Sequence, residues 1–225
     1  MNIPGAIPLG DMTVCPGHYP AKLLKALAVI ADRLHAEYGK QPWIANPDKS
    51  KESCVLASLA VRDFLRGIGF DAEVRSVCAI MKAVDACGRE LHSAGVGASN
   101  KVYARRYPDR ELDGHWNGHL VAVLPHAKVL IDTTLYPIVD RPAWSDLVTG
   151  MMALPVHVPQ SDERLFGMRV ITGSSNTADD GREFSIAWLD RPENVSWRRK
   201  GHDADRWRRK AVVDTLIAAF AWDEK

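Results

Sequence analysis

The sequence contains little cysteine, and none of it lies in a paired motif. Only four of its 225 residues are cysteine, namely Cys15, Cys54, Cys78 and Cys87. No two of them form a Cys-x-x-Cys pair, and the chain is neither short nor dense in cysteine. A disulfide framework is therefore not expected, and a reducing compartment is the default expectation.

The chain also lacks long apolar runs and an excess of charge of one sign. No apolar stretch approaches the roughly 18 residues that a membrane span requires. The first twelve residues have no basic region before an apolar run, so no signal peptide is expected. With 29 Lys and Arg against 28 Asp and Glu, the formal net charge is +1. Charge therefore gives no reason to expect a nucleic-acid or membrane partner, and we expect a cytoplasmic protein.

The overall amino-acid composition is that of an ordinary globular protein. Hydrophobic residues make up 46% of the sequence and charged residues 25%, which is typical of a chain that buries a core. There is no internal repeat and no low-complexity tract. At about 150 residues per domain, we interpret residues 1–225 as a single domain that ends in a C-terminal helix over 203–222.

The hydrophobic patterns predict helices first and strands afterwards. Helical spacing covers 20–38 and 51–66, besides the C-terminal helix, and strand patterns cover 70–81, 120–124, 129–133, 165–172 and 183–189. We expect residues 1–19 to be irregular, 82–114 to form a long loop beside a substrate cleft, and 144–152 to include a short helix. This order favours an α+β fold, with helices and antiparallel sheet segregated, over a doubly wound sheet.

Cys54 falls in or near the first turn of the helix predicted over 51–66. Asp48 and Ser50 are available as caps, and Gly67 and Gly69 end the helix. Unpaired backbone N–H groups and the positive end of the helix dipole stabilise a thiolate at such a position. Cys54 is therefore the candidate nucleophile.

A nucleophile of this kind needs a base and a residue that orients the base. His119 precedes one predicted strand and Asp132 lies in the next, and the turn between the strands predicts a hairpin. If the hairpin is centred between Pro125 and His126, His119 lies opposite Asp132. A change of one residue in the turn moves them to offset positions within reach. Cys54, His119 and Asp132 are therefore predicted to be the nucleophile, the general base and the orienting residue.

Each of these three residues also has a plainer interpretation. A cysteine in an apolar helix is most often a small buried hydrophobe. A histidine at a strand start is often structural, and an aspartate at a strand end often belongs to a turn. The other three cysteines are interpreted as structural or incidental. The order and spacing of Cys54, His119 and Asp132, taken together, favour catalysis.

Two further patterns bear on metal and nucleic-acid binding. His115 and His119 are four residues apart, as zinc-binding histidines on a helix can be. Glycines flank them and no glutamate lies between them, so we expect no metal site. The basic residues after Trp197 and around Trp207 are interpreted as a solvated face, with both tryptophans in the core. No metal or organic cofactor is expected.

Three pieces of the chain resemble the transglutaminase-like cysteine enzymes. This superfamily includes transglutaminases, related peptidases and amidases and, more distantly, the arylamine N-acetyltransferases. Ser53-Cys54 opens an apolar helix that runs into Leu-Arg-Gly-Ile-Gly-Phe-Asp-Ala-Glu-Val. Gly118-His119-Leu-Val-Ala-Val is similar to the family's His strand, and Leu130-Ile-Asp132-Thr-Thr to its Asp strand. The sequence departs from the family where Ser53 replaces a common glycine and where the Arg-Gly-Gly lead-in of the acetyltransferases is missing.

The resemblance implies a papain/transglutaminase-like α+β fold. Cys54 is then at a helix start packed on an antiparallel sheet that carries His119 and Asp132. It also implies an acyl-enzyme mechanism on an amide, ester or thioester, with a protein, a peptide or a small acyl or amide compound as substrate. Hydrolysis by a peptidase or amidase and acyl transfer, such as transglutamination or deamidation, both remain open.

The resemblance further suggests where a substrate binds. The oxyanion is expected on the backbone N–H of Cys54 and one donor from the preceding loop, for which Gln41, Trp43 and Asn46 are the candidates. His115 and Trp116 are candidates for substrate contacts. Because the transglutaminase branch commonly has a tryptophan close to its histidine, His115 is the alternative base.

A second function, of a different class, is that of a non-catalytic binding protein. Such a protein keeps a transglutaminase-like fold and holds a partner in its cleft or on its basic C-terminal helix. Selective alkylation of Cys54 favours the enzyme. A buried, unreactive Cys54 with His119 turned away favours the binding protein. No motif in the sequence selects the substrate or the oligomeric state.

Overall fold

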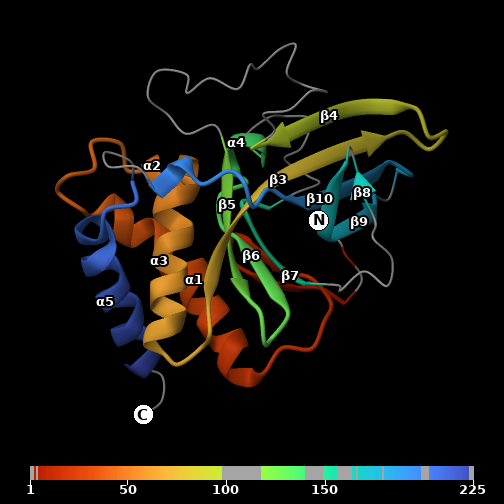
Figure 1. Cartoon of the computed structure of the whole chain (residues 1–225). Coiled ribbons are helices and arrows are strands. Elements are labelled where there is room, and N and C mark those ends of the chain that lie inside the picture. The colour runs from red at the N-terminus through yellow and green to blue at the C-terminus, as the bar shows by residue number, and fades with distance from the viewer. Residues whose placement is uncertain are drawn as a thin grey trace.

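The computed structural model of the chain describes residues 3, 5–97, 118–139, 149–156, 164–165, 167–178, 180–198 and 203–222. Helices gather on one side of a large sheet, and the sheet curls away from them (Figure 1). Predictions that concern 98–117 and 140–148, including those for His115 and Trp116, lie outside the described residues.

Five α-helices lie in the described parts of the chain: α1 (Ala21–Gly39), α2 (Lys49–Glu52), α3 (Cys54–Gly67), α4 (Tyr136–Val139) and α5 (Arg206–Trp222). Pro20 precedes α1 with φ −55°, a value that the proline ring fixes and that suits a helix start. The helix predicted over 20–38 is thus confirmed, and α5 confirms the C-terminal helix. A short 3-10 helix, η1, covers Ser196–Arg198. None of the described helices is long and apolar enough to cross a membrane.

Ten strands in the described ranges form one mixed sheet. They are β1 (Ile7–Leu9), β2 (Met12–Val14), β3 (Glu73–Val84), β4 (Glu90–Val96), β5 (His119–Leu124), β6 (Val129–Asp132), β7 (Met151–Pro155), β8 (Arg164–Leu165), β9 (Met168–Thr177) and β10 (Glu183–Asp190). Their order is β1-β2-β7-β6-β5-β3-β10-β9-β8, with β4 paired to β3. β2 and β7 run parallel, and the other pairs are antiparallel.

The sheet curls until β9 reaches β7. Thr172 Oγ1 on β9 donates a hydrogen bond of 2.7 Å to the carbonyl oxygen of Pro155 on β7. The chain is therefore an α+β protein with a curled, mostly antiparallel sheet, which confirms the fold class at that level.

Alternation along the strands gives the curled sheet an outer and an inner face. The outer face packs against α1, α3 and α5 in one hydrophobic cluster, to which Ala122 of β5 belongs. The inner face holds a second cluster, which includes Val121 and Trp188. His119 lies two residues from Val121 on β5, and Asp132 lies two residues from Leu130, another inner-face residue, on β6. Both side chains are therefore on the inner face.

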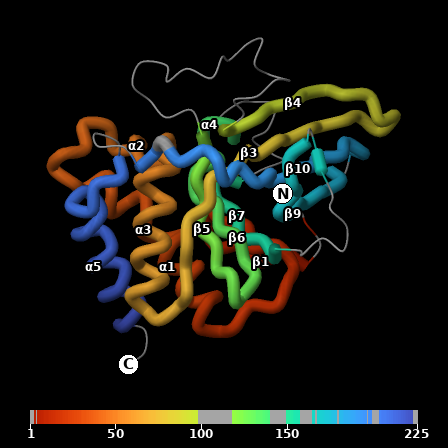
Figure 2. Tube along the Cα trace, in the orientation of Figure 1, coloured from red at the N-terminus to blue at the C-terminus, as the bar shows by residue number. Residues whose placement is uncertain are grey.

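β3 is the long strand that joins two parts of the sheet (Figure 2). Along one edge it pairs with β5 over 73–77 and then with β4 over 79–84, while its other edge pairs with β10. The end of β4 therefore meets the start of β5, and Gly97 lies against His119.

Three sequence predictions are wrong in the strands. Residues 1–19, expected to be irregular, contain β1 and β2. Residues 82–97, expected to belong to a long loop, complete β3 and form β4, and 151–152, expected in a short helix, begin β7. The physical reason is that β1 and β2 are too short to show a pattern, and β4 is largely exposed. Pairing with neighbours such as β7, far along the chain, decides their structure.

The buried face of the C-terminal helix was also predicted in part incorrectly. Leu216 and Phe220 are buried, but Trp207, which was expected in the core, is 58% exposed, and Trp222 is 80% exposed. The buried residues of α5 recur at spacings of three and four, and neither tryptophan lies on that stripe.

The first prediction concerns the contact between β4 and β5. Gly97 has φ +68°, and a Cβ built there would lie 2.5 Å from the backbone nitrogen of His119 and 2.7 Å from the carbonyl oxygen of Val77. Gly97→Ala adds this clash to a left-handed backbone that costs about 1 kcal/mol in other residues, so we expect it to lower the free energy of unfolding by about 3 kcal/mol or more. Urea unfolding measures the change.

Gly88→Ala is the matched control for this variant. Gly88 also has a positive φ, +77°, but nothing lies within 4 Å of its added Cβ. We expect it to cost only about 1 kcal/mol. Equal costs for the two variants would contradict the close approach of Gly97 to the start of β5.

Candidate active site

Cys54 is the first residue of α3 because the backbone turns at Ser53. α2 ends at Glu52, and Ser53 is extended, with φ −100° and ψ 92°, before the helix begins. The single helix predicted over 51–66 is therefore two helices. Ser53 caps the second, since its Oγ accepts a hydrogen bond from the Leu56 N–H at 3.4 Å. The first N–H groups of α3, that of Cys54 included, have no acceptor inside the helix, so a negative group is favoured there.

Ser53 is also anchored from the C-terminal part of the chain. Its hydroxyl donates a hydrogen bond of 2.6 Å to Asp203 Oδ2. Asp203 Oδ1 accepts from Arg208 Nη1 at 2.8 Å and lies 3.5 Å from Lys49 Nζ. This carboxylate therefore ties the turn before Cys54 to the start of α5.

The sulfur of Cys54 lies at the start of β5. Sγ is 3.8 Å from the carbonyl oxygen of Gly118, and the thiol is close enough to the next residue, His119, to act on the pKa of its ring. Cys54 is half-buried, whereas His119 is only 1% exposed. The sulfur is therefore the accessible member of this pair.

The predicted hairpin of β5 and β6 is present, and its register is offset. Ala122 pairs with Ile131. Continuing this register puts Asp132 opposite Val121, two residues from His119. The centre of the hairpin lies one residue later in the chain than it would if His119 and Asp132 were directly opposite each other. An offset of two keeps both side chains on one face. His119 Nε2 and Asp132 Oδ2 are 2.6 Å apart.

The ring of His119 is held between two groups that favour its protonation. Burial by itself lowers the pKa of His119, but the charge of Asp132, the hydrogen bond to it, and the interaction with Cys54 together raise the pKa to about 10. Nε2 bonds the carboxylate and so carries a proton. The other ring nitrogen, Nδ1, is the one that Asp132 does not engage.

Asp132 is a fully buried carboxylate with three hydrogen-bond donors. Besides His119, Trp188 Nε1 donates to Oδ2 at 2.8 Å, and the Thr134 N–H donates to Oδ1 at 3.1 Å. A buried carboxylate without such donors is costly. Sequence analysis did not identify Trp188. A buried indole N–H needs an acceptor, but only the curl of the sheet shows which acceptor it meets.

A second buried histidine, which sequence analysis also did not identify, contacts the residue that follows Asp132. His35 on α1 has Nδ1 2.9 Å from Ser50 Oγ and Nε2 2.9 Å from the carbonyl oxygen of Thr133. A carbonyl oxygen only accepts, so Nε2 carries the proton and Nδ1 accepts from the Ser50 hydroxyl. Burial lowers the pKa of His35 to about 4. Ser50 is itself fully buried, so this pair is a structural contact and not an exposed nucleophile.

Two loop candidates for the second oxyanion donor have partners of their own. Gln41 Nε2 donates to the carbonyl oxygen of Glu37 at 3.1 Å, and Asn46 Oδ1 accepts from the Asp48 N–H at 3.0 Å. No hydrogen bond among the residues that the structure describes joins either side chain to Cys54. Their part in an oxyanion site stays a prediction.

The third loop candidate, Trp43, packs between α1 and α5. Its ring is edge-on to Tyr38 at 6.3 Å and to Trp207 at 5.6 Å between centroids. The guanidinium of Arg208 lies 5.2 Å from its centroid. These contacts fix the loop before α2 against the start of α5.

The other cysteines differ from Cys54 in their surroundings. Cys15 and Cys78 are buried, and burial raises the pKa of both thiols, that of Cys78 to about 11. Cys87 is exposed in the turn between β3 and β4. It therefore provides an internal reference for the reactivity of an ordinary surface thiol.

A zinc site at His115 and His119 was the other interpretation of these histidines in the sequence. His115 lies outside the described residues, and His119 Nε2 is bonded to Asp132. In the described ranges, no group of three or more His, Cys, Asp or Glu side chains is arranged to hold a metal ion.

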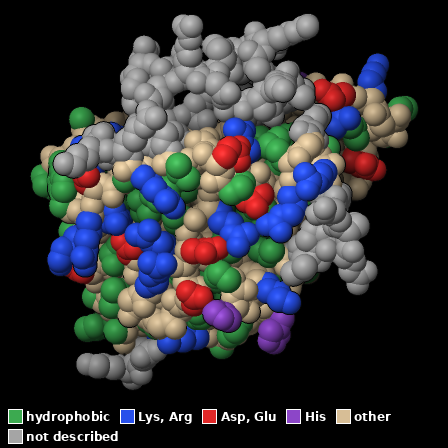
Figure 3. Space-filling view, viewed as in Figure 1, with side chains coloured by type: hydrophobic (Ala, Val, Ile, Leu, Met, Phe, Trp, Pro, Cys, Tyr) green, Lys and Arg blue, Asp and Glu red, His purple; other side chains and the backbone are tan. Residues whose placement is uncertain are grey.

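Basic side chains gather on the face formed by α3 and α5 (Figure 3). Many of their charges are paired: Asp63 accepts hydrogen bonds from Arg62, at 2.8 Å, and from Arg209. Lys210 Nζ lies 2.6 Å from Asp214 Oδ2. Carboxylates within the face thus offset part of its positive charge. Of the two tryptophans expected in the core beside these residues, Trp197 is buried.

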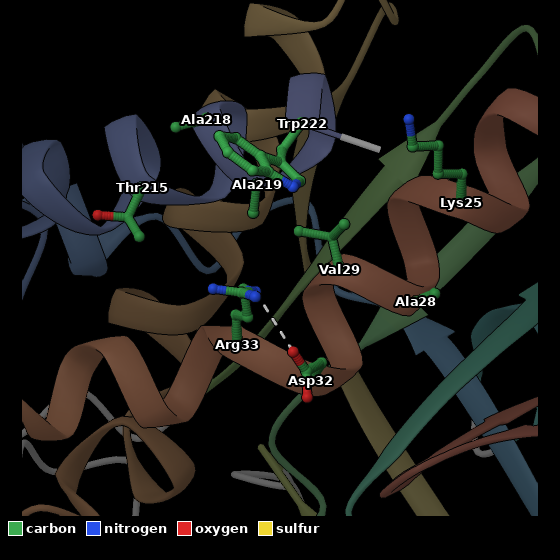
Figure 4. A pocket seen from close by; sticks show the side chains of 9 residues that line it. All are labelled: Lys25, Ala28, Val29, Asp32, Arg33, Thr215, Ala218, Ala219 and Trp222. Atoms are coloured by element: carbon green, nitrogen blue, oxygen red, sulfur yellow. Dashed lines mark ion pairs between the residues drawn. The ribbon is translucent and has the colours of Figure 1, made fainter. Parts of the chain in front are cut away.

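A pocket of about 550 Å³ lies between α1 and α5, away from Cys54 (Figure 4). Trp222 faces Val29 across it, and the Asp32–Arg33 ion pair, at 3.3 Å, lies in its wall. The residues that line it include no cysteine and no histidine. This cavity therefore lacks the side-chain types that lie together at Cys54.

The second prediction is a loss of stability in acid that depends on His35. The folded pKa of about 4 lies below the ordinary value of 6.5. Between these values the unfolded chain binds a proton that the folded protein does not, so stability falls as the pH falls through this window. The loss amounts to about 3 kcal/mol. The free energy of unfolding in urea, measured from pH 7 to pH 4, tests it.

His35→Gln is the control for this titration because glutamine does not ionise there. The variant should lack the His35 share of the acid loss, so its stability should fall by about 3 kcal/mol less over the same window. The folded pKa of His119 is raised, so its contribution is complete only below its ordinary value and is lost as the pH rises through about 10. It is the same in wild type and variant and cancels from their difference. Equal acid losses in wild type and variant would show that His35 titrates normally.

Comparisons with known proteins give no relative for this arrangement. The chain matches none of the protein-family models, none of the curated proteins and none of the solved structures with which it was compared. The case for its activity therefore depends on the residues and contacts described above.

Proposed function

We propose that the protein is a cysteine-nucleophile enzyme in which Cys54, His119 and Asp132 act together through an acyl-enzyme. The observation that carries the proposal is the position of the His119 ring. Its Nε2 is 2.6 Å from a fully buried carboxylate, and the thiol of Cys54 is close enough to favour protonation of the ring. A thiol at a helix start, a base within reach and a carboxylate that orients the base are the parts this chemistry requires.

In the first step the acyl group moves to sulfur. Cys54 gives its proton to His119 Nδ1, and the thiolate attacks the carbonyl carbon of an amide, ester or thioester. An S–C bond forms as the carbonyl π electrons move to oxygen. The intermediate collapses when the C–N, C–O or C–S bond breaks and His119 gives a proton to the leaving group. Asp132 stabilises the imidazolium in between.

In the second step the thioester is resolved. Water or an amine attacks the acyl carbon, His119 takes the proton of the attacking group, and the Cys54 sulfur leaves. Water as acceptor makes the protein a peptidase or amidase, and an amine makes it an acyltransferase. The same side chains serve both reactions, and neither step needs a metal or an organic cofactor.

The developing oxyanion is proposed to bind at the start of α3. The N–H of Cys54 points out of the first turn of the helix, where the dipole favours negative charge. The second donor is proposed to come from the loop that carries Gln41, Trp43 and Asn46. To donate to the substrate, Gln41 would have to give up its hydrogen bond to the carbonyl oxygen of Glu37.

We also propose a papain/transglutaminase-like fold. Support comes from the order of the parts: α3 with Cys54 as its first residue, then β5 with His119, then β6 with Asp132, with α3 packed on the sheet. A protein, a peptide or a small acyl or amide compound remains the proposed substrate, and the cytoplasm the proposed compartment.

The third prediction tests the proposed nucleophile by alkylation. Iodoacetamide should label Cys54 of the folded wild type faster than Cys87 at about pH 6, because the ring of His119 withdraws the thiol proton. His119→Ala should slow labelling of Cys54 by about tenfold or more and leave Cys87 unchanged. Peptide mass mapping over a series of pH values measures both rates in one sample.

The internal reference makes the result decisive. If Cys54 in the folded wild type is alkylated no faster than Cys87, the catalytic assignment is lost, and the alternative of a non-catalytic binding protein is favoured. If Cys54 is fast but His119→Ala has no effect, His119 is not its base.

A further inference from the structure

His35 connects the two segments that carry the nucleophile and the orienting carboxylate. On one side, its Nδ1 accepts from Ser50 in α2, four residues before Cys54. On the other, its Nε2 donates to the carbonyl oxygen of Thr133, the residue after Asp132. Both hydrogen bonds are 2.9 Å long and buried. One side chain of α1 therefore bridges segments that are far apart in the sequence.

The backbone after Asp132 has few other contacts that fix it. β6 ends at Asp132, the last residue that pairs with β7. Beyond it, the Thr134 N–H donates to the carboxylate of Asp132 itself, and the Leu135 N–H bonds to the residue before β7. The hydroxyls of Thr133 and Thr134 are buried and have no hydrogen-bond partner among the described residues. Within the described ranges, His35 is the side chain that hydrogen-bonds the peptide group next to Asp132.

The other end of the bridge bears on Cys54. α2 is only four residues long and leads directly into Ser53, the cap of α3. Ser50 has no exposed surface, and its hydroxyl is the group of α2 that bonds His35. A shift of Ser50 would move Ser53 and, with it, the first turn of α3.

The ring of His35 is confined on its other sides. Tyr136 packs edge-on against it, with centroids 5.2 Å apart. Lys51, Asp11 and Asp48 are the charged groups that act on it. Two specific hydrogen bonds and a close aromatic neighbour leave the ring one orientation, as a bridge between α2 and Thr133 requires.

Building on the function proposed above, we propose that His35 is a positioning residue that holds the segments of Cys54 and Asp132 at the separation at which His119 contacts both. His35 touches neither sulfur nor substrate. It acts through Ser50 and Thr133, so its loss should change the geometry of the site and leave its chemical groups in place.

Three variants separate positioning from general stability. His35→Phe keeps a planar ring and removes both hydrogen bonds. His35→Gln retains a donor and an acceptor that can occupy the places of the two ring nitrogens. Ser50→Ala removes only the bond to α2. Thr172→Val is the matched control, since it removes a hydrogen bond of 2.7 Å that the buried Thr172 makes where β9 meets β7.

Two readouts are made on each folded variant. The first is the alkylation rate of Cys54 at about pH 6, which should fall about tenfold or more in His35→Phe, stay within about threefold in His35→Gln, and be unchanged in Thr172→Val. The second is the low-field NMR resonance of the proton between His119 Nε2 and Asp132 Oδ2. It should be lost or shifted in His35→Phe and retained in His35→Gln and Thr172→Val.

A folded His35→Phe with the wild-type rate and resonance would overturn the proposal. If His35→Phe does not fold, Ser50→Ala decides: a slower rate or a shifted resonance supports the bridge, and wild-type behaviour overturns it. If Cys54 of the wild type is no more reactive than Cys87, the proposed function fails, but the NMR resonance still decides whether His35 positions Asp132.

Discussion

The hydrogen bond between His119 and Asp132 is the contact on which most others in the site depend. Both side chains are almost wholly removed from water, and a buried charge costs several kcal/mol unless partners offset the cost. The donors to Asp132 come from three places: His119 on β5, Trp188 on β10 and the backbone after β6. A single carboxylate therefore constrains three parts of the chain at once, including the ring of His119, the proposed base.

The curl of the sheet allows those donors to meet. In the strand order, β3 and β5 lie between β10 and β6. On a flat sheet, that separation would be about 14 Å, beyond the reach of an indole. Curling brings the inner faces together, so Trp188 reaches Asp132. At the same end of β5, Gly97 lets β4 finish against the backbone of His119. The site thus lies where the start of α3, the start of β5 and the end of β4 meet.

Local signals in the sequence predicted part of this site. The apolar helix with Cys54 in its first turn follows from hydrophobic spacing, and the hairpin that carries His119 and Asp132 follows from alternation and a turn. The cap was predicted incorrectly, because Ser53, and not Asp48 or Ser50, caps the helix of Cys54. The register of this hairpin could not be predicted, because its turn includes Lys128 with φ +52°, a conformation that lysine does not favour. Trp188 and His35 could not be identified, since their roles depend on sheet curl and on helix packing, not on neighbours in the sequence. The same reason explains why β1 and β2 were missed.

Formation of an acyl-enzyme is the central claim, and its most direct test is to trap that species. The protein would be mixed with p-nitrophenyl acetate, quenched in acid within seconds, and examined by intact mass and peptide mapping. The account predicts one acetyl group on Cys54 of the wild type, released by hydroxylamine, and little or none at that position in His119→Ala. Acetyl groups on Cys87 or on lysines, with Cys54 unmodified, would contradict it.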